Sequence, residues 1–499
     1  MEYYYICSSI IAFQGDLLMK KLDISKLLLA SAFLAAPAAA QDFAGLPSVK
    51  EIVSQAKASE VPVPLPAAPQ DARTVKEWTI MVFMNGKNNL SSYVIEDMNE
   101  MEKYGPTENI NIVTQAARIK YTPPSYPPNG GYYDDWGNGP VVPHPGWPNP
   151  YWGGMPPMMM KDAASRDAST DWAGVRRYLV TADGDNAALS STMLSDLGSV
   201  DMGDYKQLVE FGKWAKQAYP AKKYMLIVWN HGDGWKNKAF GQPVLKGISY
   251  DDETGNGIST VNLGLAVREM GGVDIYASDA CLMQMAEVAY ELKDAARITV
   301  GSEENEPGDG WAYDYFLSRV HSNKTNLTPD VMAAAAVQGY KAFYGEKGTA
   351  ATQSAVRTSG LTAFRAQLDN WAELVMKEDK AMVKEALNAA TAFGGAGSRD
   401  LIHFMENVHG KTKSRGLKAQ TVTVMNLLYN KVIIDNGATG DKFKKAYGVA
   451  AYLPTYSYED DYDQLAWAKE GKWDDFAKWI TARDAAPAVN SHAQEAALR

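Results

Sequence analysis

The chain alternates between short runs of consecutive apolar residues and longer segments in which apolar residues recur every three or four positions. The first run, residues 78–84, has the sequence WTIMVFM and predicts a buried strand. Residues 90–104 follow with Val94 and Met98 at helical spacing, and a second apolar run occupies residues 110–114. Strand, helix and strand in this order predict a parallel sheet.

The same alternation continues to about residue 301. Further strands are predicted at residues 177–181, 224–229, 273–277 and 298–301, and further helices at residues 205–219, 261–270 and 282–292. The last of these helices begins directly after Cys281. We therefore expect a doubly wound α/β fold, with a mostly parallel sheet flanked by helices and functional groups at the carboxyl ends of the strands.

From about residue 328 the pattern becomes mostly helical. Helices are predicted at residues 331–343, 361–383 and 401–408, and an apolar run at residues 448–453 is expected to return to the main sheet as a strand. These elements predict an α/β domain over residues 74–320, a helical C-terminal part over residues 321–484 with a strand near residues 447–453, and a disordered tail at residues 485–499.

Residues 121–160 interrupt the alternation with Pro, Gly, Tyr and Trp in quick succession. This composition suits neither a helix nor a strand, so we interpret the segment as a long insertion. It forms either an aromatic binding surface or a poorly ordered surface loop. His144 within it has no partner at a useful spacing.

The first 40 residues are typical of a secretory signal. A basic pair at residues 20–21 precedes an apolar stretch at residues 27–36 that is too short to span a bilayer, and small residues predict cleavage after Ala40. Translation is expected to start at Met19, which makes residues 1–18 upstream sequence. The alternative is a membrane anchor. Cleavage would export the protein to the periplasm, the cell surface or the medium.

The predicted export affects how the cysteine content is interpreted. The chain has 2 cysteines, and Cys7 is removed with the signal, so Cys281 is the only cysteine of the exported chain. The exported chain is expected to begin with a mobile leader at residues 41–73. This excludes an internal disulfide framework and a cysteine-based metal cluster. A buried free cysteine behaves as a small hydrophobe, so Cys281 is either core filler or a reactive thiol.

The length of the chain limits the number of domains, and its charge limits the kinds of partner. With 499 residues, of which 46% are hydrophobic, the chain can form one large or two medium domains with a sizeable core. Its formal net charge of -10 and its lack of a basic run argue against a nucleic-acid-binding protein.

Two predicted strands are followed directly by residues that can take part in catalysis. His231 follows the strand at residues 224–229, and Cys281 follows the strand at residues 273–277, so both are expected at one sheet edge. A thiol becomes nucleophilic as thiolate, which a nearby imidazole or a helix N-terminus favours. The amides of Gly232 and Cys281 are candidates for an oxyanion hole. The alternative for His231 is a core histidine bonded to a backbone carbonyl.

The segments WNHGDGW and SDACLMQMAEVAYEL around these residues resemble the histidine and cysteine motifs of the clostripain family of cysteine peptidases, relatives of the caspase, gingipain and separase group. The resemblance covers residues 76–315 well. It implies a caspase-like sheet, a dyad of His231 and Cys281, and Asp279 as the acidic floor of the S1 pocket, which receives the side chain before the cleaved bond. Cleavage after Arg or Lys would follow. Alternatively, Asp279 caps the next helix.

Two further residues come from the same resemblance. Asp309, in the sequence EPGDGW, is the candidate second acid of the pocket, although such loops also carry Asp for turn chemistry alone. Members of the family are made as zymogens that cut themselves between the two motifs. Lys246, in the polar loop at residues 236–258, is therefore the candidate self-cleavage site.

Metal binding stays open. Some members of the family depend on calcium, and acidic sets at residues 183–185 and 251–253 supply suitable oxygen ligands, but neither matches an EF-hand loop and both are also typical of surface turns. His403 and His409 are six positions apart, which is not a helical ligand spacing. Motifs of zinc proteases, nucleotide-binding loops and serine hydrolases are absent.

The sequence therefore predicts a secreted cysteine endopeptidase that acts through a thioester acyl-enzyme on peptides or proteins with basic P1 residues, P1 being the residue before the cleaved bond. No nucleic-acid partner and no membrane span in the mature chain are expected, and nothing indicates an oligomeric state. A rival interpretation is a catalytically idle secreted protein that binds peptide or glycan on the same fold. A third is an amidase of cell-wall peptides.

Overall fold

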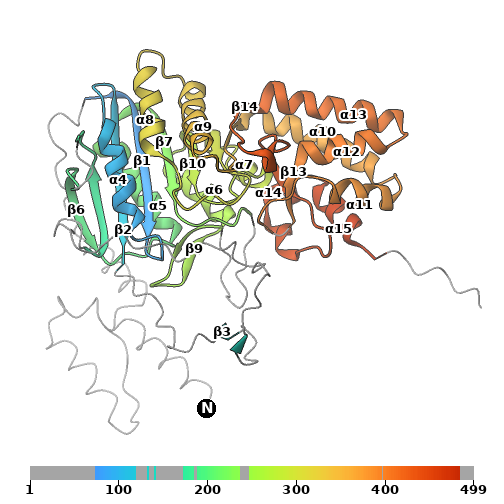
Figure 1. Cartoon of the computed structure of the whole chain (residues 1–499), viewed down its shortest axis with the longest axis horizontal. Helices are drawn as coiled ribbons and strands as arrows, with labels where there is room; N and C mark the ends of the chain where they lie inside the picture. Colours follow the sequence, from blue (N-terminus) through green and yellow to red (C-terminus); the bar gives the residue numbers. More distant parts are fainter. Residues whose placement is uncertain are drawn as a thin grey trace, which may run out of the picture. The chain divides into compact units, whose positions relative to one another are not determined.

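A nine-stranded mixed sheet forms the centre of the computed structural model, which describes residues 74–119, 132–133, 140–141, 172–184, 188–235, 247–395 and 397–483 (Figure 1). The strand order is β14-β12-β11-β10-β7-β1-β2-β5-β6. The five parallel strands are β1 (Lys76–Gly86), β2 (Ile110–Arg118), β7 (Ala221–Trp229), β10 (Val273–Asp279) and β11 (Ala296–Gly301). Antiparallel strands flank them, namely β5 (Gly174–Leu179), β6 (Thr192–Gly198), β12 (Ser354–Arg357) and β14 (Ile433–Asn436).

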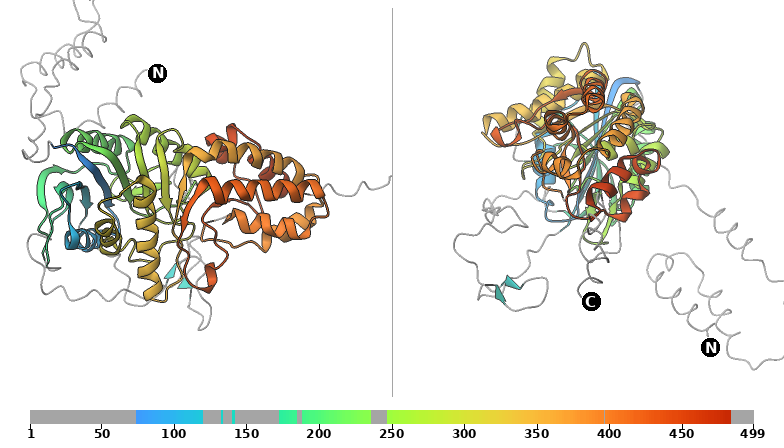
Figure 2. Two further views of the ribbon diagram at one scale, coloured as in Figure 1. Left: turned by 90° about the horizontal axis from the view of Figure 1, so that it is seen from above. Right: turned by 90° about the vertical axis from the view of Figure 1, so that its right-hand side faces the viewer.

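Helices cover both faces of this sheet, as the left panel of Figure 2 shows. One face packs against α4 (Tyr93–Tyr104), α8 (Tyr313–Ser322) and α9 (Pro329–Glu346), and the other against α5 (Tyr205–Ala218), α6 (Thr260–Glu269) and α7 (Ala286–Glu291). The alternation of side chains along β1 explains this, because Ile80 and Val82 belong to the first core and Met81 and Phe83 to the second. A continuous apolar strand is thus buried on both sides.

The C-terminal region is mainly helical and lies beyond the β14 edge of the sheet (Figure 1). Its helices are α10 (Leu361–Val375), α11 (Lys380–Asn388), α12 (Leu401–Lys411), α13 (Arg415–Leu427), α14 (Ala466–Lys469) and α15 (Trp473–Thr481). Trp371 at its centre has ring contacts with Phe404, Trp473 and Phe476. This core is continuous with the one that covers the α5–α7 face of the sheet.

Short elements complete the fold. Three small sheets pair β3 (Tyr132–Tyr133) with β4 (Pro140–Val141), β8 (Ile248–Asp251) with β9 (Asn256–Ile258), and β13 (Ser398–Asp400) with β15 (Ala450–Tyr452). Short 3-10 turns occupy Thr358–Gly360, Asp441–Phe443 and Asp460–Gln464, and a π-helical turn occupies Leu428–Val432.

The predicted fold class is confirmed, with differences in particular elements. The run at residues 448–453 does not return to the main sheet, because β15 pairs with β13 and Ala450 bridges to Met285. The helix predicted at residues 361–383 is two helices, since Asp379 caps α11 by accepting the amide of Ala381. The strands β6, β12 and β14 are additions to the prediction.

Several predicted segments lie outside the described residues. These are the signal at residues 1–40, the leader at residues 41–73, most of the insertion at residues 121–160, and the tail at residues 485–499. Within the described part of the chain, no helix has the length and apolar character needed to cross a membrane.

Candidate active site

Two neighbouring strands end at the same edge of the sheet and carry the candidate dyad. β7 and β10 are parallel partners, and Trp229 at the end of β7 lies beside Asp279 at the end of β10. The amide of Asn230 donates to the carbonyl oxygen of Asp279 over 3.1 Å, which joins the two strand ends. His231 and Cys281 each follow this pair by two residues, so the fold delivers both to one edge.

The turn that carries His231 lies directly against the turn that carries Cys281. A Cβ atom at Gly232 would lie 2.5 Å from the carbonyl oxygen of Cys281, which is closer than a side chain tolerates. The Cys281 turn is itself constrained, because Leu282 has a left-handed backbone with a φ of 64°. The amide of Leu282 donates to the carbonyl oxygen of Glu304 over 3.1 Å and holds the turn in place.

The helix after Cys281 begins later than the sequence predicts. α7 spans Ala286–Glu291 rather than residues 282–292, because the left-handed Leu282 breaks the helical path and Met285 is still extended. Cys281 therefore does not lie at a helix N-terminus. The expectation that such a terminus stabilises its thiolate is wrong, and so is the alternative of Asp279 as the cap of that helix.

The thiol of Cys281 is free and partly buried. Its Sγ accepts a hydrogen bond from the amide of Glu306 over 3.3 Å. Burial, and to a smaller extent the negative charge of Glu306, raise the pKa of the Cys281 thiol to about 12. At neutral pH the resting thiol is therefore protonated, and attack requires a base that takes its proton.

His231 has the properties of such a base. Its Nε2 lies 2.7 Å from Oδ1 of Asn89, in the segment that follows β1. Because an amide oxygen only accepts hydrogen bonds, this contact assigns the imidazole proton to Nε2 and leaves Nδ1 as the acceptor. Burial lowers the pKa of His231 below its usual 6.5 and outweighs the nearby Asp233 and Asp252, so the ring is neutral at pH 7.

Asn89 is a site residue that the sequence does not single out. It lies 142 positions before His231, and only the sheet brings the two together. The available signal is its position, since polar residues directly after a buried strand at the carboxyl edge of a parallel sheet often face the site.

Backbone amides around the two turns include donors for an oxyanion. Those of Asn230, Asp233 and Leu282 donate to backbone carbonyl oxygens. Hydrogen bonds within the described part of the chain leave the amides of Gly232 and Cys281 without an acceptor. These are the two donors named from the sequence, and their turns are in contact.

A buried cluster of acidic side chains adjoins the thiol. Asp279 is 4% exposed, and its Oδ1 and Oδ2 accept the amide of Trp311 over 3.1 Å and the hydroxyl of Tyr313 over 2.9 Å. The carboxyl of Glu306 is hydrogen bonded to that of Asp279. Burial raises the pKa of Asp279 to about 6 and that of Glu306 well above its usual range.

A third acid lies behind this pair. Asp97 of α4 accepts the indole N–H of Trp229 over 2.6 Å and is 4% exposed. Burial, followed by the charge of Asp279, raises the pKa of Asp97 well above its usual range. No lysine or arginine of the described segments lowers the pKa of any of the three carboxyls. The cluster is thus acidic, and no described residue supplies a cation to it.

Asp309 is not part of this acidic cluster. Its carboxylate is exposed and forms an ion pair with Lys347 at 2.6 Å. The backbone next to it approaches Asp279 instead, since a Cβ at Gly310 would lie 2.9 Å from Oδ1 of Asp279. The second acid beside Asp279 is Glu306, which lies three positions before Asp309 in the sequence.

The candidate calcium ligands have structural partners where they are described. Asp251 accepts the amides of Met202 and Glu253, and both Asp251 and Glu253 form ion pairs with the buried Lys87. Across the described ranges, no group of three His, Cys, Asp or Glu side chains has the arrangement of a metal site. Asp185 and the self-cleavage candidate Lys246 lie outside those ranges.

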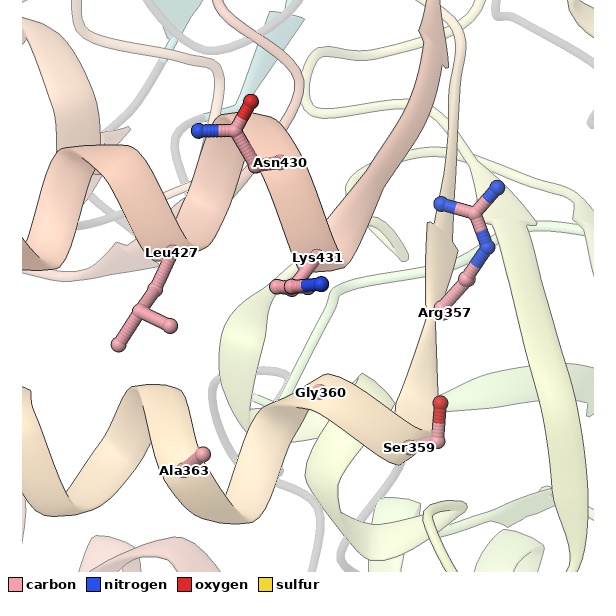
Figure 3. A pocket seen from close by; sticks show the side chains of 7 residues that line it. All are labelled: Arg357, Ser359, Gly360, Ala363, Leu427, Asn430 and Lys431. Atoms are coloured by element: carbon pink, nitrogen blue, oxygen red, sulfur yellow. The ribbon is translucent and has the colours of Figure 1, made fainter.

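The helical region contains a cavity of about 580 Å³ that is separate from the dyad (Figure 3). It lies between the start of α10 and the end of α13 and is lined by Arg357, Ser359, Gly360, Ala363, Leu427, Asn430 and Lys431. Arg357 pairs with Asp330 at 3.0 Å, and the lining contains no cysteine, histidine or acid. His403 is likewise a structural residue, since its Nδ1 accepts the amide of Thr391.

Comparison with known proteins points to one family. The sequence model of the clostripain family matches residues 82–479, which is most of the chain. Clostripain of Hathewaya histolytica is 25% identical over 273 residues, which cover 50% of this chain and 44% of that protein. The chain thus spans less than half the length of this curated relative.

Solved structures with similar folds are C11 proteases. A secreted C11 cysteine protease of Bacteroides thetaiotaomicron, solved with an irreversible peptide inhibitor, has a TM-score of 0.53 and 17% identity over 80% of this chain and 99% of its own. An inactive zymogen C11 protease of Parabacteroides distasonis has a TM-score of 0.52 and 15% identity over 80% of this chain and 98% of its own. At these identities the likeness concerns the fold, which is the α/β fold predicted from the sequence.

Proposed function

The chain belongs to the clostripain family of cysteine proteases, and from this premise we propose that it is an exported endopeptidase that cleaves peptide bonds after Arg or Lys. Cys281 is the nucleophile and His231 its proton-transfer partner. The observation that carries the proposal is the free thiol of Cys281 beside the buried acids Asp279 and Glu306, to which the described residues supply no cation.

The first half of the reaction begins from a neutral dyad. As Sγ of Cys281 attacks the carbonyl carbon of the scissile bond, Nδ1 of His231 takes the thiol proton. The negative charge moves to the carbonyl oxygen, and the amides of Gly232 and Cys281 donate to it. When the intermediate collapses, the C–N bond breaks, His231 returns the proton to the leaving amine, and a thioester remains on Cys281.

Hydrolysis of the thioester completes the cycle. His231 takes a proton from a water molecule, whose oxygen attacks the thioester carbon. The C–S bond then breaks, and the proton on His231 passes to the sulfur, which restores the thiol and the neutral imidazole. The products are a peptide acid that ends in the P1 residue and a peptide amine.

The acidic cluster supports the choice of a basic P1 residue. A guanidinium or ammonium group would pair with Asp279 and Glu306 in a site shielded from water, where charge-assisted hydrogen bonds are strong. A neutral side chain would leave a buried charge unpaired, so the pocket discriminates against it.

We also propose that the protein is made as a zymogen and cuts itself at Lys246 or at another lysine of the 236–246 segment. A basic-specific protease accepts such a site, and one structural neighbour is described as an inactive zymogen. Purified wild type should separate into two fragments under denaturing conditions, whereas Cys281→Ala stays whole. If wild type and Cys281→Ala both remain as one unbroken chain, self-cleavage is excluded.

Turnover of chromogenic peptides with Arg or Lys at P1, combined with iodoacetamide labelling of Cys281, tests the main proposal. A protease shows both turnover and labelling, and labelling abolishes turnover. Absence of both would favour the rival interpretation, an idle peptide- or glycan-binding protein. A reactive thiol with activity only on cell-wall peptides would instead indicate an amidase.

A further inference from the structure

We propose that Asp279 and Glu306 hold one proton between them and that the basic P1 side chain expels this proton when it binds. The inference rests on the proposed function, because the P1 group is the cation that displaces the proton. It also assigns the role of second pocket acid to Glu306 rather than to Asp309.

The two carboxyls are neighbours because of the elements that carry them. Asp279 ends β10, and Glu306 lies in the segment after β11, the strand that pairs with β10. The amide of Glu306 donates to Sγ of Cys281 over 3.3 Å. The carboxyl pair is therefore fixed beside the nucleophile, where a P1 side chain has to enter.

Hydrogen-bond donors around the pair are too few for two carboxylates. Asp279 receives the amide of Trp311 and the hydroxyl of Tyr313, one on each oxygen. The indole N–H of Trp311 lies close enough to lower the pKa of Glu306. It does not reach hydrogen-bond geometry, and Oε1 of Glu306 is buried without a hydrogen bond to any described residue. Two ionised carboxylates in contact repel each other in a site of low polarity, so a proton shared between them replaces the missing donor.

A second polar atom in the same place lacks a partner. The hydroxyl of Tyr340 on α9 is buried, forms no hydrogen bond with any described residue, and feels the charges of Glu306, Asp279 and Cys281. Its oxygen can accept a hydrogen bond from an ammonium or guanidinium group. A bound ammonium or guanidinium group could donate hydrogen bonds to both the Tyr340 oxygen and Oε1 of Glu306.

Among the described residues, the titratable groups whose pKa responds to the charges of the pair are all acidic or neutral. They are Asp97 and Glu100 of α4, Tyr313 of α8, Tyr340 and Tyr344 of α9, and Cys281. Burial raises the pKa of Glu100 to about 7, and its carboxylate accepts the amide of Tyr313. None of these groups supplies positive charge to the pair, so the arriving P1 group is its first cation.

Binding and proton release are therefore linked. Where the free pair holds a proton and the complex does not, the binding constant rises about tenfold for each pH unit. Replacing Glu306 by Gln keeps the size and a hydrogen-bond donor but removes the shared proton. The pH dependence of binding should disappear with it.

Calorimetry on the full chain with Cys281→Ala tests this without turnover. The probe is an acetylated tripeptide that ends in arginine amide, titrated from pH 6 to 8.5 in buffers of different ionisation enthalpy, which counts the protons released. We expect release of nearly one proton at pH 7 and an affinity that rises with pH. With Glu306→Gln added, we expect no release and an affinity that is flat with pH and at least tenfold weaker at pH 8.5.

Asp309→Asn in the same background is the matched control, because its exposed carboxylate pairs with Lys347 outside the pocket. It should behave like the parent, and thermal unfolding should show that all variants are folded. Equal proton release with and without Glu306→Gln would overturn the inference, and so would a parent that binds without release. If wild type also fails to cleave after Arg and Lys, the proposed function fails as well. If wild type cleaves after Arg and Lys but the probe binds without proton release, the proposed function stands and only the inference of a shared proton fails.

Discussion

The contact between Asn89 and His231 decides which imidazole nitrogen is available for catalysis. Nε2 faces the amide oxygen at 2.7 Å, so Nδ1 is left to exchange a proton with the thiol. Asn89 is a positioning residue in this scheme, since it acts through His231. Its loss would free the ring to rotate and to change tautomer.

We predict that Asn89→Ala lowers kcat by about 10- to 100-fold with little change in KM, because a misoriented base slows proton transfer but not binding. Asn89→Asp should restore orientation and, through its charge, raise the pKa of His231. The acid limb of the kcat profile then moves to higher pH, because the base has to be neutral. Unchanged rates and pH profiles in both variants would contradict the role. The control is Asn430→Ala, at an exposed position in the C-terminal region.

Gly232 is the point where the turns of the two proposed catalytic residues touch. We predict that Gly232→Ala lowers kcat/KM by about 100-fold or more, because its Cβ would overlap the carbonyl oxygen of Cys281 and displace an oxyanion donor. Gly410→Ala on the exposed side of α12 meets nothing within 4 Å and should leave kinetics unchanged. Steady-state assays of both variants check this, and a fully active Gly232→Ala would refute the close contact.

The residues of the site differ in how far the sequence reveals them. His231 and Cys281 follow predicted strands directly, so their placement at one edge needs only local pattern and the geometry of parallel sheets. Asn89 and Glu306 act through contacts with residues 142 and 25 positions away. Such contacts depend on turns whose conformation the sequence pattern does not specify.

At the scale of elements, long apolar runs were predictable and short or exposed strands were not. β1, β7 and β10 are buried over most of their length, so their composition alone identifies them. β6 is a largely exposed edge strand, and β12 and β14 have four residues each. The start of α7 depends on one left-handed residue, Leu282, which no periodicity indicates.

A second pair of buried acids ties the C-terminal region to the segment that follows β11. Glu303 accepts the amide of Gly448, and Asp400, the cap of α12, accepts the amide of Tyr447. The two carboxyls are hydrogen bonded to each other. Burial raises the pKa of Asp400 to about 7 and that of Glu303 well above its usual range. The folded protein therefore keeps protons that an unfolded chain would lose near pH 4.

We predict that this pair makes the protein less stable as pH rises. Because the folded state binds more protons, the free energy of unfolding falls between about pH 4 and 7, by about 1.4 kcal/mol per pH unit for each extra proton. Glu303→Gln removes one carboxyl and should be the more stable protein at pH 8, by about 1–2 kcal/mol. Urea unfolding at pH 5 and 8 in the Cys281→Ala background measures this.

The exposed Glu385→Gln, which breaks an ion pair with Lys411, is the control for that measurement and should leave the pH slope unchanged. A wild-type slope that persists in Glu303→Gln would show that the pair does not hold extra protons. The comparison of variants is needed because other buried acids, such as Glu287, titrate in the same range.

At the scale of the whole molecule, the C-terminal region packs against the sheet edge that carries Cys281. The amide of Ala450 donates to Gln284 just after Cys281, and the amide of Gly394 donates to Glu304 in the segment that reaches the thiol. The apolar core runs without a break from the sheet face into these helices. The predicted division into an α/β part and a helical part thus describes element content, while packing joins the two.

The most direct test of the central claim is the turnover of one peptide series in which only P1 varies, through Arg, Lys, Gln and Leu, by wild type, Cys281→Ala and Asp279→Asn. We predict that wild type cleaves only the basic peptides at a substantial rate and that Cys281→Ala cleaves none. Asp279→Asn should lose about 100-fold or more in kcat/KM on Arg and Lys, with a smaller change on Gln. Equal cleavage of all four peptides by wild type, or cleavage by Cys281→Ala, would contradict a Cys281 protease with an acidic P1 pocket.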